Sequence, residues 1–408
     1  MIIKNENYCL GDFNFLEDVK KMVDMPTAVS IYDLTLREGN QTPGCVMRKE
    51  EQIAIAIELD KLGVDFIEFF PAVSKDDEWV VNELVSNNML KHAKVSALVR
   101  PRTIDMELAI KTHAQHIFLE GAGNMITAGT MNYKSVDEII QSFVDTIKVA
   151  HDHGMTVTAC PWDIGKVEDI SVVEKWVRAL AEAGAEDICY ADTFGYTLPW
   201  TTHYMIKKYR EWAGPDTIIS CHFHNDYGLA TASTLAAVAA GAKRVQVGFN
   251  NLGERAGNAA IDEVALNLEV NMGIKSGINL ASLYPLSKKI GEITKKPVGG
   301  KKPVTGEETF MMGSGIIVEA LSRLAVDGNE NCFLPFRPEL VGQPPFTTVY
   351  GKGAGRNMIK RFVQKMNLEA TEEQIQQILL AVKEESMLIK NLISEFRVEQ
   401  IVKETLKK

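Results

Sequence analysis

Residues 171–192 read SVVEKWVRALAEAGAEDICYAD. The first part of this stretch is amphipathic, as expected of a helix that packs on a core, and Gly184 follows it where a left-handed residue commonly ends a helix. The second part, Asp187–Ala191, is a short apolar run typical of a buried strand, and polar Asp192 comes directly after it. The stretch therefore predicts a helix, a glycine stop and a strand with a polar side chain at its carboxyl end.

The same pattern recurs along the chain and predicts the fold. Gly63 and Gly241 end two further helical segments just before apolar runs. Eight such units over roughly 250 residues predict an α/β fold, the (β/α)8 TIM barrel, because a parallel sheet must be covered by helices. No glycine-rich phosphate-binding motif opens a helix, which disfavours an open dinucleotide-binding sheet. The expected strands are Val29–Asp33, Asp65–Phe69, Lys94–Val99, His116–Leu119, Met155–Ala159, Asp187–Ala191, Thr217–His222 and Arg244–Gly248.

The chain changes in composition near residue 288. Residues 288–303 are rich in lysine, glycine and proline, which is typical of an exit from one domain into another. We expect an N-terminal extension over residues 1–27, a TIM-barrel catalytic domain over 28–287, and a linker with a small helical C-terminal subdomain over 288–408. The helices expected in the subdomain are Ile316–Leu324, Asn357–Phe362 and Glu372–Leu392.

The composition is that of a soluble, enzyme-sized protein, with 408 residues, 46% hydrophobic residues and a formal net charge of -10. The acidic balance argues against a nucleic-acid partner, and the sequence does not read as membrane-spanning. The six cysteines form no C-x-x-C pair, as is typical of reduced thiols. The N-terminal segment lacks the apolar core and cleavage site of a secretory signal, so we expect a cytoplasmic protein.

Two segments far apart in the sequence contain the residue types of a metal site. They are DLTLREGNQ at 33–41 and CHFHND at 221–226, and each follows a predicted strand. Because side chains alternate along a strand, His222 and His224 point the same way. Two imidazoles and a carboxylate that converge from different strands suit a divalent cation with open coordination positions. A His-x-His pair alone could equally be a hydrogen-bonded core pair, so the surrounding motifs decide.

Polar residues directly after the predicted strands form the candidate site, because active sites in such barrels lie at the carboxyl ends of the strands. Taken singly, several of them have a structural explanation: Asp192 could cap a loop, and Glu68 could serve only as an ion-pair partner of Arg37. The candidates are Asp33, Arg37, Glu38, Gln41, Glu68, Arg100, Asp192, Thr193, His222, His224, Asn225 and residues 250–258.

Four motifs carry a resemblance to a known family: D-x-T-L-R-E-G-x-Q at 33–41, DTFGY at 192–196, HFHND at 222–226 and NLGERAGNA at 251–259. The chain resembles the 2-isopropylmalate, homocitrate and citramalate synthases, whose superfamily includes 3-hydroxy-3-methylglutaryl-CoA lyase. The resemblance implies a metal-dependent Claisen-type condensation of an acyl-CoA such as acetyl-CoA with a 2-oxo acid. It also implies a homodimer in which the C-terminal subdomain covers the barrel mouth of the partner.

The resemblance also implies roles for individual residues. The implied metal ligands are Glu38, His222, His224 and Asn258, and their mixed nitrogen and oxygen donors suit Mg, Mn or Zn. Arg37 is implied to stabilise an enolate or carbonyl oxygen, with Glu68 holding Arg37 in place. Thr193 is implied to contact the substrate carboxylate. We also expect Gln41, Arg100, Trp162 and Asp192 to bind substrate, because of their positions after predicted strands.

The chain departs from this family in residues that transfer protons. Trp162 stands where the synthases have glutamate, and no histidine follows His224, although the synthases have histidines in this C-terminal region. The sequence therefore leaves the identity of the general base open. Candidates by position alone are Glu307, Glu308, Tyr350 and Lys352.

Three functions are compatible with these residues. The first is the condensing enzyme with altered specificity, which the synthase-like C-terminal segment favours. The second is a metal-dependent carbon-carbon lyase or aldolase that cleaves a 3-hydroxy acid or its CoA ester, which Trp162 and the missing histidines favour. The third is a family member that binds metal without turnover, against which the intact Arg37, Glu38, His222 and His224 argue.

Overall fold

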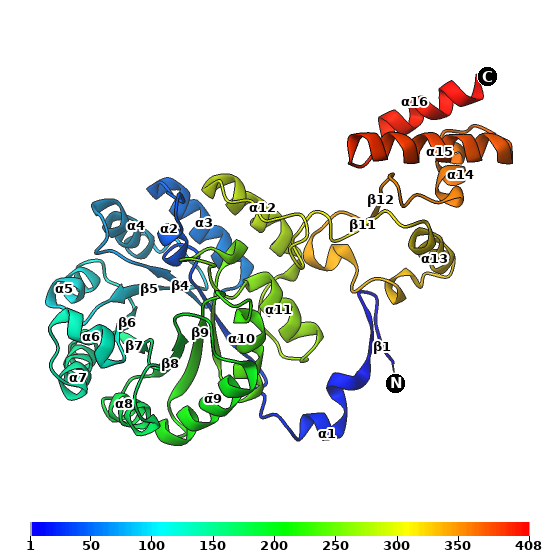
Figure 1. Cartoon of the computed structure of the whole chain (residues 1–408). Helices are drawn as coiled ribbons and strands as arrows, with labels where there is room; N and C mark the ends of the chain where they lie inside the picture. The colour runs from blue at the N-terminus through cyan, green and yellow to red at the C-terminus, as the bar shows by residue number, and fades with distance from the viewer. Residues whose placement is uncertain (1, 408) are drawn as a thin grey trace. The chain divides into compact units, whose positions relative to one another are not determined.

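The barrel expected from the sequence is present in a computed structural model that describes residues 2–407 (Figure 1). Eight parallel strands close in the order β10-β3-β4-β5-β6-β7-β8-β9. The strands are β3 (Ser30–Asp33), β4 (Phe66–Phe69), β5 (Lys94–Val99), β6 (His116–Ala122), β7 (Thr156–Trp162), β8 (Asp187–Asp192), β9 (Ile218–Phe223) and β10 (Arg244–Val247).

Helices surround the strands on the outside of the barrel (Figure 1). Several begin at a side-chain cap: the Ser135 hydroxyl, for example, accepts the backbone N–H of Glu138 at the start of α7. Gly63 ends α3 in the left-handed region with φ of 104°, and a Cβ there would lie 2.4 Å from the carbonyl oxygen of Gly277. The longer helices are α3 (Lys49–Leu62), α4 (Lys75–Ser86), α5 (Thr103–Lys111), α7 (Val136–Asp152), α8 (Ile170–Glu182), α9 (Pro199–Ala213), α10 (Ala230–Ala239), α11 (Ile261–Val270) and α12 (Leu283–Thr294).

The middle of the barrel is filled by side chains, so it is a core and no channel. The rings of Tyr32 and Phe66 stack with centroids 5.6 Å apart, and Phe118 packs beside Tyr32. Other members of this layer are Leu34, Leu98, Cys160, Cys189 and Ala191. Because alternate residues of each strand face inward, the polar side chains beyond this layer lie at the carboxyl ends of the strands.

A buried ion pair lies within the barrel near the start of β8 and β10. Arg244 Nη1 lies 2.7 Å from Asp187 Oδ2 and donates to Thr158 Oγ1 at 3.2 Å. The Arg244 guanidinium also lies 4.3 Å from the ring centroid of Phe66. Removing one partner of such a pair leaves the other charge buried without compensation.

We expect Arg244→Leu to lower the free energy of unfolding of the barrel by about 3–5 kcal/mol, measured by urea denaturation. The double variant Arg244→Leu/Asp187→Leu should recover much of this loss, because neither charge is then buried alone. Arg323→Leu is the matched control, since Arg323 pairs with Glu319 at the surface, and a surface pair contributes about 0–1 kcal/mol. A loss below about 1 kcal/mol for Arg244→Leu would contradict the expectation.

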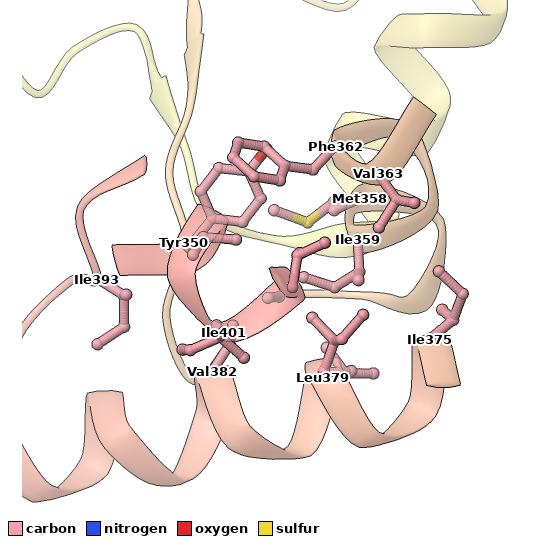
Figure 2. Close-up of a cluster of buried hydrophobic side chains, with 14 of the residues drawn as sticks. Tyr350, Met358, Ile359, Phe362, Val363, Ile375, Leu379, Val382, Ile393 and Ile401 are labelled. Atoms are coloured by element: carbon pink, nitrogen blue, oxygen red, sulfur yellow. The ribbon is translucent and has the colours of Figure 1, made fainter. Parts of the chain in front are cut away.

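The described chain divides into two compact units, residues 13–298 and residues 2–12 with 299–407. The second unit holds the strands β1 (Ile2–Lys4), β2 (Cys9–Gly11), β11 (Met311–Met312) and β12 (Thr347–Thr348) and the helices α13 (Gly315–Val326), α14 (Arg356–Lys365), α15 (Glu372–Ile389) and α16 (Glu395–Leu406). Figure 2 shows its core, where Phe362 of α14, Leu379 of α15 and Ile401 of α16 are buried together with Tyr350. The helix α16 was not predicted from the sequence.

Across residues 2–407, the helices are too short or too polar for any of them to span a lipid bilayer.

Candidate active site and metal centre

The segment after β3 turns sharply into the barrel mouth. The Asp33 carboxylate accepts the Thr35 backbone N–H at 2.9 Å and the Thr35 hydroxyl at 3.0 Å, which fixes the turn. The short helix α2 (Glu38–Gln41) then begins, and its first residue is buried with Arg37. Asp33 thus has a structural role, and it directs Arg37 and Glu38 towards the centre of the barrel.

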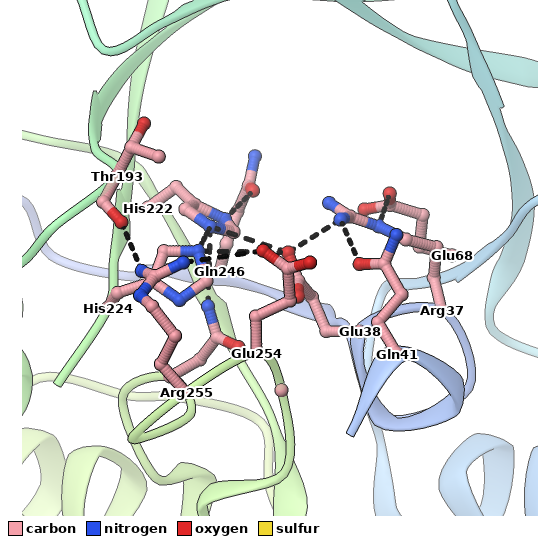
Figure 3. A network of polar contacts seen from close by, with 12 residues as sticks. Arg37, Glu38, Gln41, Glu68, Thr193, His222, His224, Gln246, Glu254 and Arg255 are labelled. Atoms are coloured by element: carbon pink, nitrogen blue, oxygen red, sulfur yellow. Dashed lines mark hydrogen bonds and ion pairs between the residues drawn. The ribbon is translucent and has the colours of Figure 1, made fainter. Parts of the chain in front are cut away.

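Arg37 lies between two carboxylates (Figure 3). Its Nε donates to Glu68 Oε1 at 2.5 Å, and its Nη1 donates to Glu38 Oε1 at 2.5 Å and to Gln41 Oε1 at 3.3 Å. Glu68 is fully buried in β4, so its contact with Arg37 orients the guanidinium. The third nitrogen, Nη2, makes no hydrogen bond to another residue in the described part of the chain, which leaves one donor group for a ligand.

Glu38, His222 and His224 come together as the sequence predicted. Glu38 Oε1 lies 3.8 Å from His222 Nε2 and 3.9 Å from His224 Nε2, and the two imidazole nitrogens lie 3.2 Å apart. Within residues 2–407, neither Glu38 Oε2 nor His224 Nδ1 has a hydrogen-bond partner, although both are buried. Glu38, His222 and His224 each offer one ligand atom, and these three atoms lie within 4.8 Å of one another, an arrangement that fits a divalent ion.

The protonation of the histidines also fits a metal. Burial, with the neighbouring His224, lowers the pKa of His222 to about 3, and burial lowers the pKa of His224, so both rings are neutral at physiological pH. His222 Nδ1 lies 2.9 Å from Gln246 Oε1, which requires the proton on Nδ1. The lone pair of His222 Nε2 is then the one that a metal would use, in place of the present contacts of Nε2 with Asn258 Nδ2 at 3.3 Å and His224 Nε2 at 3.2 Å.

Asn258 reaches the same point from the loop after β10. The backbone of residue 258 forms a bridge with His224, and the Asn258 amide nitrogen Nδ2 lies 3.3 Å from His222 Nε2. The preceding Gly257 has φ of +76°, and a Cβ there would meet the Asn251 carbonyl oxygen at 1.6 Å. Only glycine fits this turn, which brings the Asn258 side chain beside His222. The amide oxygen Oδ1 is buried without a hydrogen-bond partner among residues 2–407, and an amide oxygen is a group that divalent cations accept as a ligand.

A cavity of about 430 Å³ opens above these residues at the barrel mouth. Of the candidates from the sequence, it is lined by Arg37, Glu38, Gln41, Arg100, Trp162, Thr193, His222, His224 and Glu254 of the range 250–258. Glu68, Asp192 and Asn258 do not line it. Asp192 Oδ2 instead accepts the backbone N–H of Thr197 at 2.6 Å and shapes its own loop.

Some side chains of the cavity wall already form hydrogen bonds to neighbouring protein groups. The Thr193 hydroxyl accepts the Asp163 backbone N–H at 2.9 Å, and Arg100 Nε donates to Asp105 Oδ2 at 2.6 Å. Sequence reasoning missed several lining residues: Phe70, Phe118, Glu120, Met131 and Tyr133. Glu120 escaped because the strand was predicted to end at Leu119, whereas β6 continues to Ala122. The sequence could have indicated Glu120, because a carboxylate two residues after the inward-facing Phe118 also faces inward if the strand continues.

The chain resembles known proteins over nearly its whole length. The family model described as HMGL-like matches residues 28–290, and the model described as homocitrate synthase post-HMGL domain-like matches residues 304–387. A probable 2-isopropylmalate synthase of Ignicoccus hospitalis is 34% identical over 365 residues, which is 89% of each chain. The homocitrate synthase of Methanopyrus kandleri is 32% identical over 375 residues, which is 90% of each chain.

Solved structures support the fold of the barrel. The HMG-CoA lyase of Bacillus subtilis superposes with a TM-score of 0.61 at 22% sequence identity, covering 68% of this chain and 97% of the lyase. At this level of identity the likeness concerns the fold alone.

Proposed function

This chain belongs to the HMGL-like family and is a condensing enzyme of the acyltransferase type, as its synthase relatives are; from this premise we propose that it joins acetyl-CoA to the carbonyl carbon of a 2-oxo acid in a metal-dependent reaction. The observation that carries the proposal is the position of Arg37 in the same cavity as Glu38, His222 and His224. We place the reaction in the cytoplasm, in accord with six free cysteines.

The proposed roles follow from the chemistry of each group. Glu38, His222, His224 and Asn258 would hold Mg, Mn or Zn, and a bound divalent ion would polarise the carbonyl of a chelating 2-oxo acid. Arg37, held by Glu68, directs a donor into the cavity, where it stabilises negative charge that develops on oxygen. Gln41, Arg100, Trp162 and Thr193 surround the substrate, while Asp192 supports the loop that carries Thr193.

The test is a panel of 2-oxo acids incubated with acetyl-CoA and the metal-loaded protein, with free thiol as the readout. We expect thiol release that depends on one or a few 2-oxo acids. The second candidate is a carbon-carbon lyase, favoured by Trp162 in the cavity wall. Cleavage of the corresponding hydroxy acids or their CoA esters, without thiol release in the forward assay, would support the lyase and contradict the condensing enzyme.

We propose that the active form is a homodimer that associates through the C-terminal unit. At the junction of α15 and α16, Leu388 is 83% exposed and Phe396 is 69% exposed, while the inner faces of these helices form a core. A symmetric dimer covers such apolar side chains.

The expected molar mass in light scattering is therefore about twice the 45.2 kDa of one chain. Leu388→Asp/Phe396→Asp should shift the mass to that of a monomer, because charge on both sides of the two-fold axis opposes association. Ile104→Asp is the control, since Ile104 is an exposed apolar residue of the barrel unit. A dimer that persists in the double variant would exclude this surface as the interface.

A further inference from the structure

Glu120 occupies an inward-facing position at the carboxyl end of β6. Alternation along the strand places Phe118 and Glu120 on the same face, and Phe118 belongs to the layer that fills the barrel. Glu120 is paired in register with Cys160 of β7, another member of that layer. The Glu120 side chain therefore stands directly beyond this layer, and it lines the cavity with Arg37 and the candidate metal ligands.

Besides Glu120, the carboxylates and histidines of the cavity wall, together with Arg37 and Tyr133, already have partners or tasks. Glu38, His222 and His224 form the candidate metal centre, and Arg37 is bound to Glu68 and Glu38. Glu254 pairs with Arg255 at 3.3 Å, and the Tyr133 hydroxyl donates to Ser142 Oγ at 3.4 Å.

Two neutral candidates for a base are also unsuitable. Burial raises the pKa of the Cys160 thiol well above its usual range, so this thiol stays protonated at neutral pH. Burial raises the pKa of Tyr350 to about 12, and Tyr350 lies in the core of the C-terminal unit with its ring 5.2 Å from that of Phe362.

Glu120 differs from all of these groups. It makes no hydrogen bond and no ion pair with another residue in the described range 2–407. Burial raises its pKa, opposed by the charge of Arg37 and assisted by Glu38 and Glu254. A carboxylate in such a site accepts a proton more readily than one in water, which is what a general base requires.

Resting on the proposed condensation, we infer that Glu120 is the base that removes a proton from the carbon next to the thioester carbonyl of the acyl-CoA. The electron pair of that C–H bond forms the new C–C bond to C2 of the 2-oxo acid. The carbonyl π bond of the 2-oxo acid breaks, and its oxygen takes up a proton. Water then cleaves the thioester, which yields a carboxylic acid and free CoA thiol, so that atoms and charges balance.

Glu120→Gln tests this inference in the full-length, metal-loaded protein, because glutamine keeps the shape and removes the basicity. We expect the kcat of thiol release to fall at least 100-fold. Metal content should match the wild type, and 2-oxo acid affinity, followed by the fluorescence of Trp162 in the cavity wall, should change less than about threefold. Glu120→Asp, which keeps a carboxylate, should recover part of the rate. Glu174→Gln, at a surface glutamate of α8, is the charge control.

Three results would overturn the inference. A kcat for Glu120→Gln within about threefold of the wild type would show that Glu120 transfers no proton. A large loss of 2-oxo acid affinity in the same variant would make Glu120 a binding residue instead. Absence of thiol release by the wild type with every 2-oxo acid would overturn the proposed function itself, and the role of Glu120 with it.

Discussion

Replacing His222 by alanine is expected to remove the bound metal and to lower kcat by more than about 100-fold, with the fold retained. Replacing a residue that only hydrogen-bonds to a metal ligand typically lowers metal affinity or activity by about 10–100-fold. Because His222 is a candidate ligand itself, we expect a larger effect. The ring is neutral and buried, and its Nε2 lies 3.2 Å from the matching nitrogen of His224. Metal content by inductively coupled plasma mass spectrometry and circular dichroism would be measured on the same sample.

The matched control is His203→Ala, because His203 lies on α9 outside the cavity. It should bind metal and turn over like the wild type. The double variant His222→Ala/His224→Ala gives the stricter comparison. Full metal stoichiometry in that variant would show that these two histidines form a hydrogen-bonded core pair and that the metal assignment is wrong.

Arg37→Lys is expected to lower kcat by roughly tenfold or more while 2-oxo acid binding is retained. Lysine keeps the positive charge but loses the planar fork, whose Nε and Nη1 are held by Glu68 and Glu38 so that a third donor is directed into the cavity. Steady-state kinetics would separate the effects on kcat and KM.

Arg178→Lys serves as the control for this substitution, since Arg178 forms a surface pair with Glu174 on α8. A wild-type kcat for Arg37→Lys would mean that Arg37 serves only as a structural partner of Glu68.

Most of the barrel could be predicted because its signals are local. The strand Lys94–Val99 has the predicted bounds, and Gly63 ends the helix α3 as predicted. The glycine stops, the apolar runs and the polar residues after them depend on nearby residues, so a single sequence contains them. The cluster of Glu38, His222 and His224 followed from the same logic, because parallel strands bring their carboxyl ends to one face.

The features that could not be predicted from the sequence depend on contacts inside the barrel between residues that are far apart in the sequence. The pairing of Arg244 with Asp187 joins residues 57 positions apart, and no local pattern announces it. The inward-facing position of Glu120 was not predicted, because β6 continues for three residues past the predicted end at Leu119 and Glu120 is the first of them. For Asp192 the sequence allowed both a loop cap and a substrate contact; its Oδ2 accepts the Thr197 backbone N–H as a loop cap does, while a substrate contact stays a prediction.

The most direct test of the proposed reaction is to follow acetyl-CoA labelled with ¹³C at the methyl carbon by NMR, in the presence of the metal-loaded protein and the 2-oxo acid that releases thiol. We expect the label to appear as a methylene carbon bonded to a carbon that carries a hydroxyl group, at the same rate as the thiol is released. Label recovered only as free acetate, with the 2-oxo acid unchanged, would show thioester hydrolysis and would contradict the condensation.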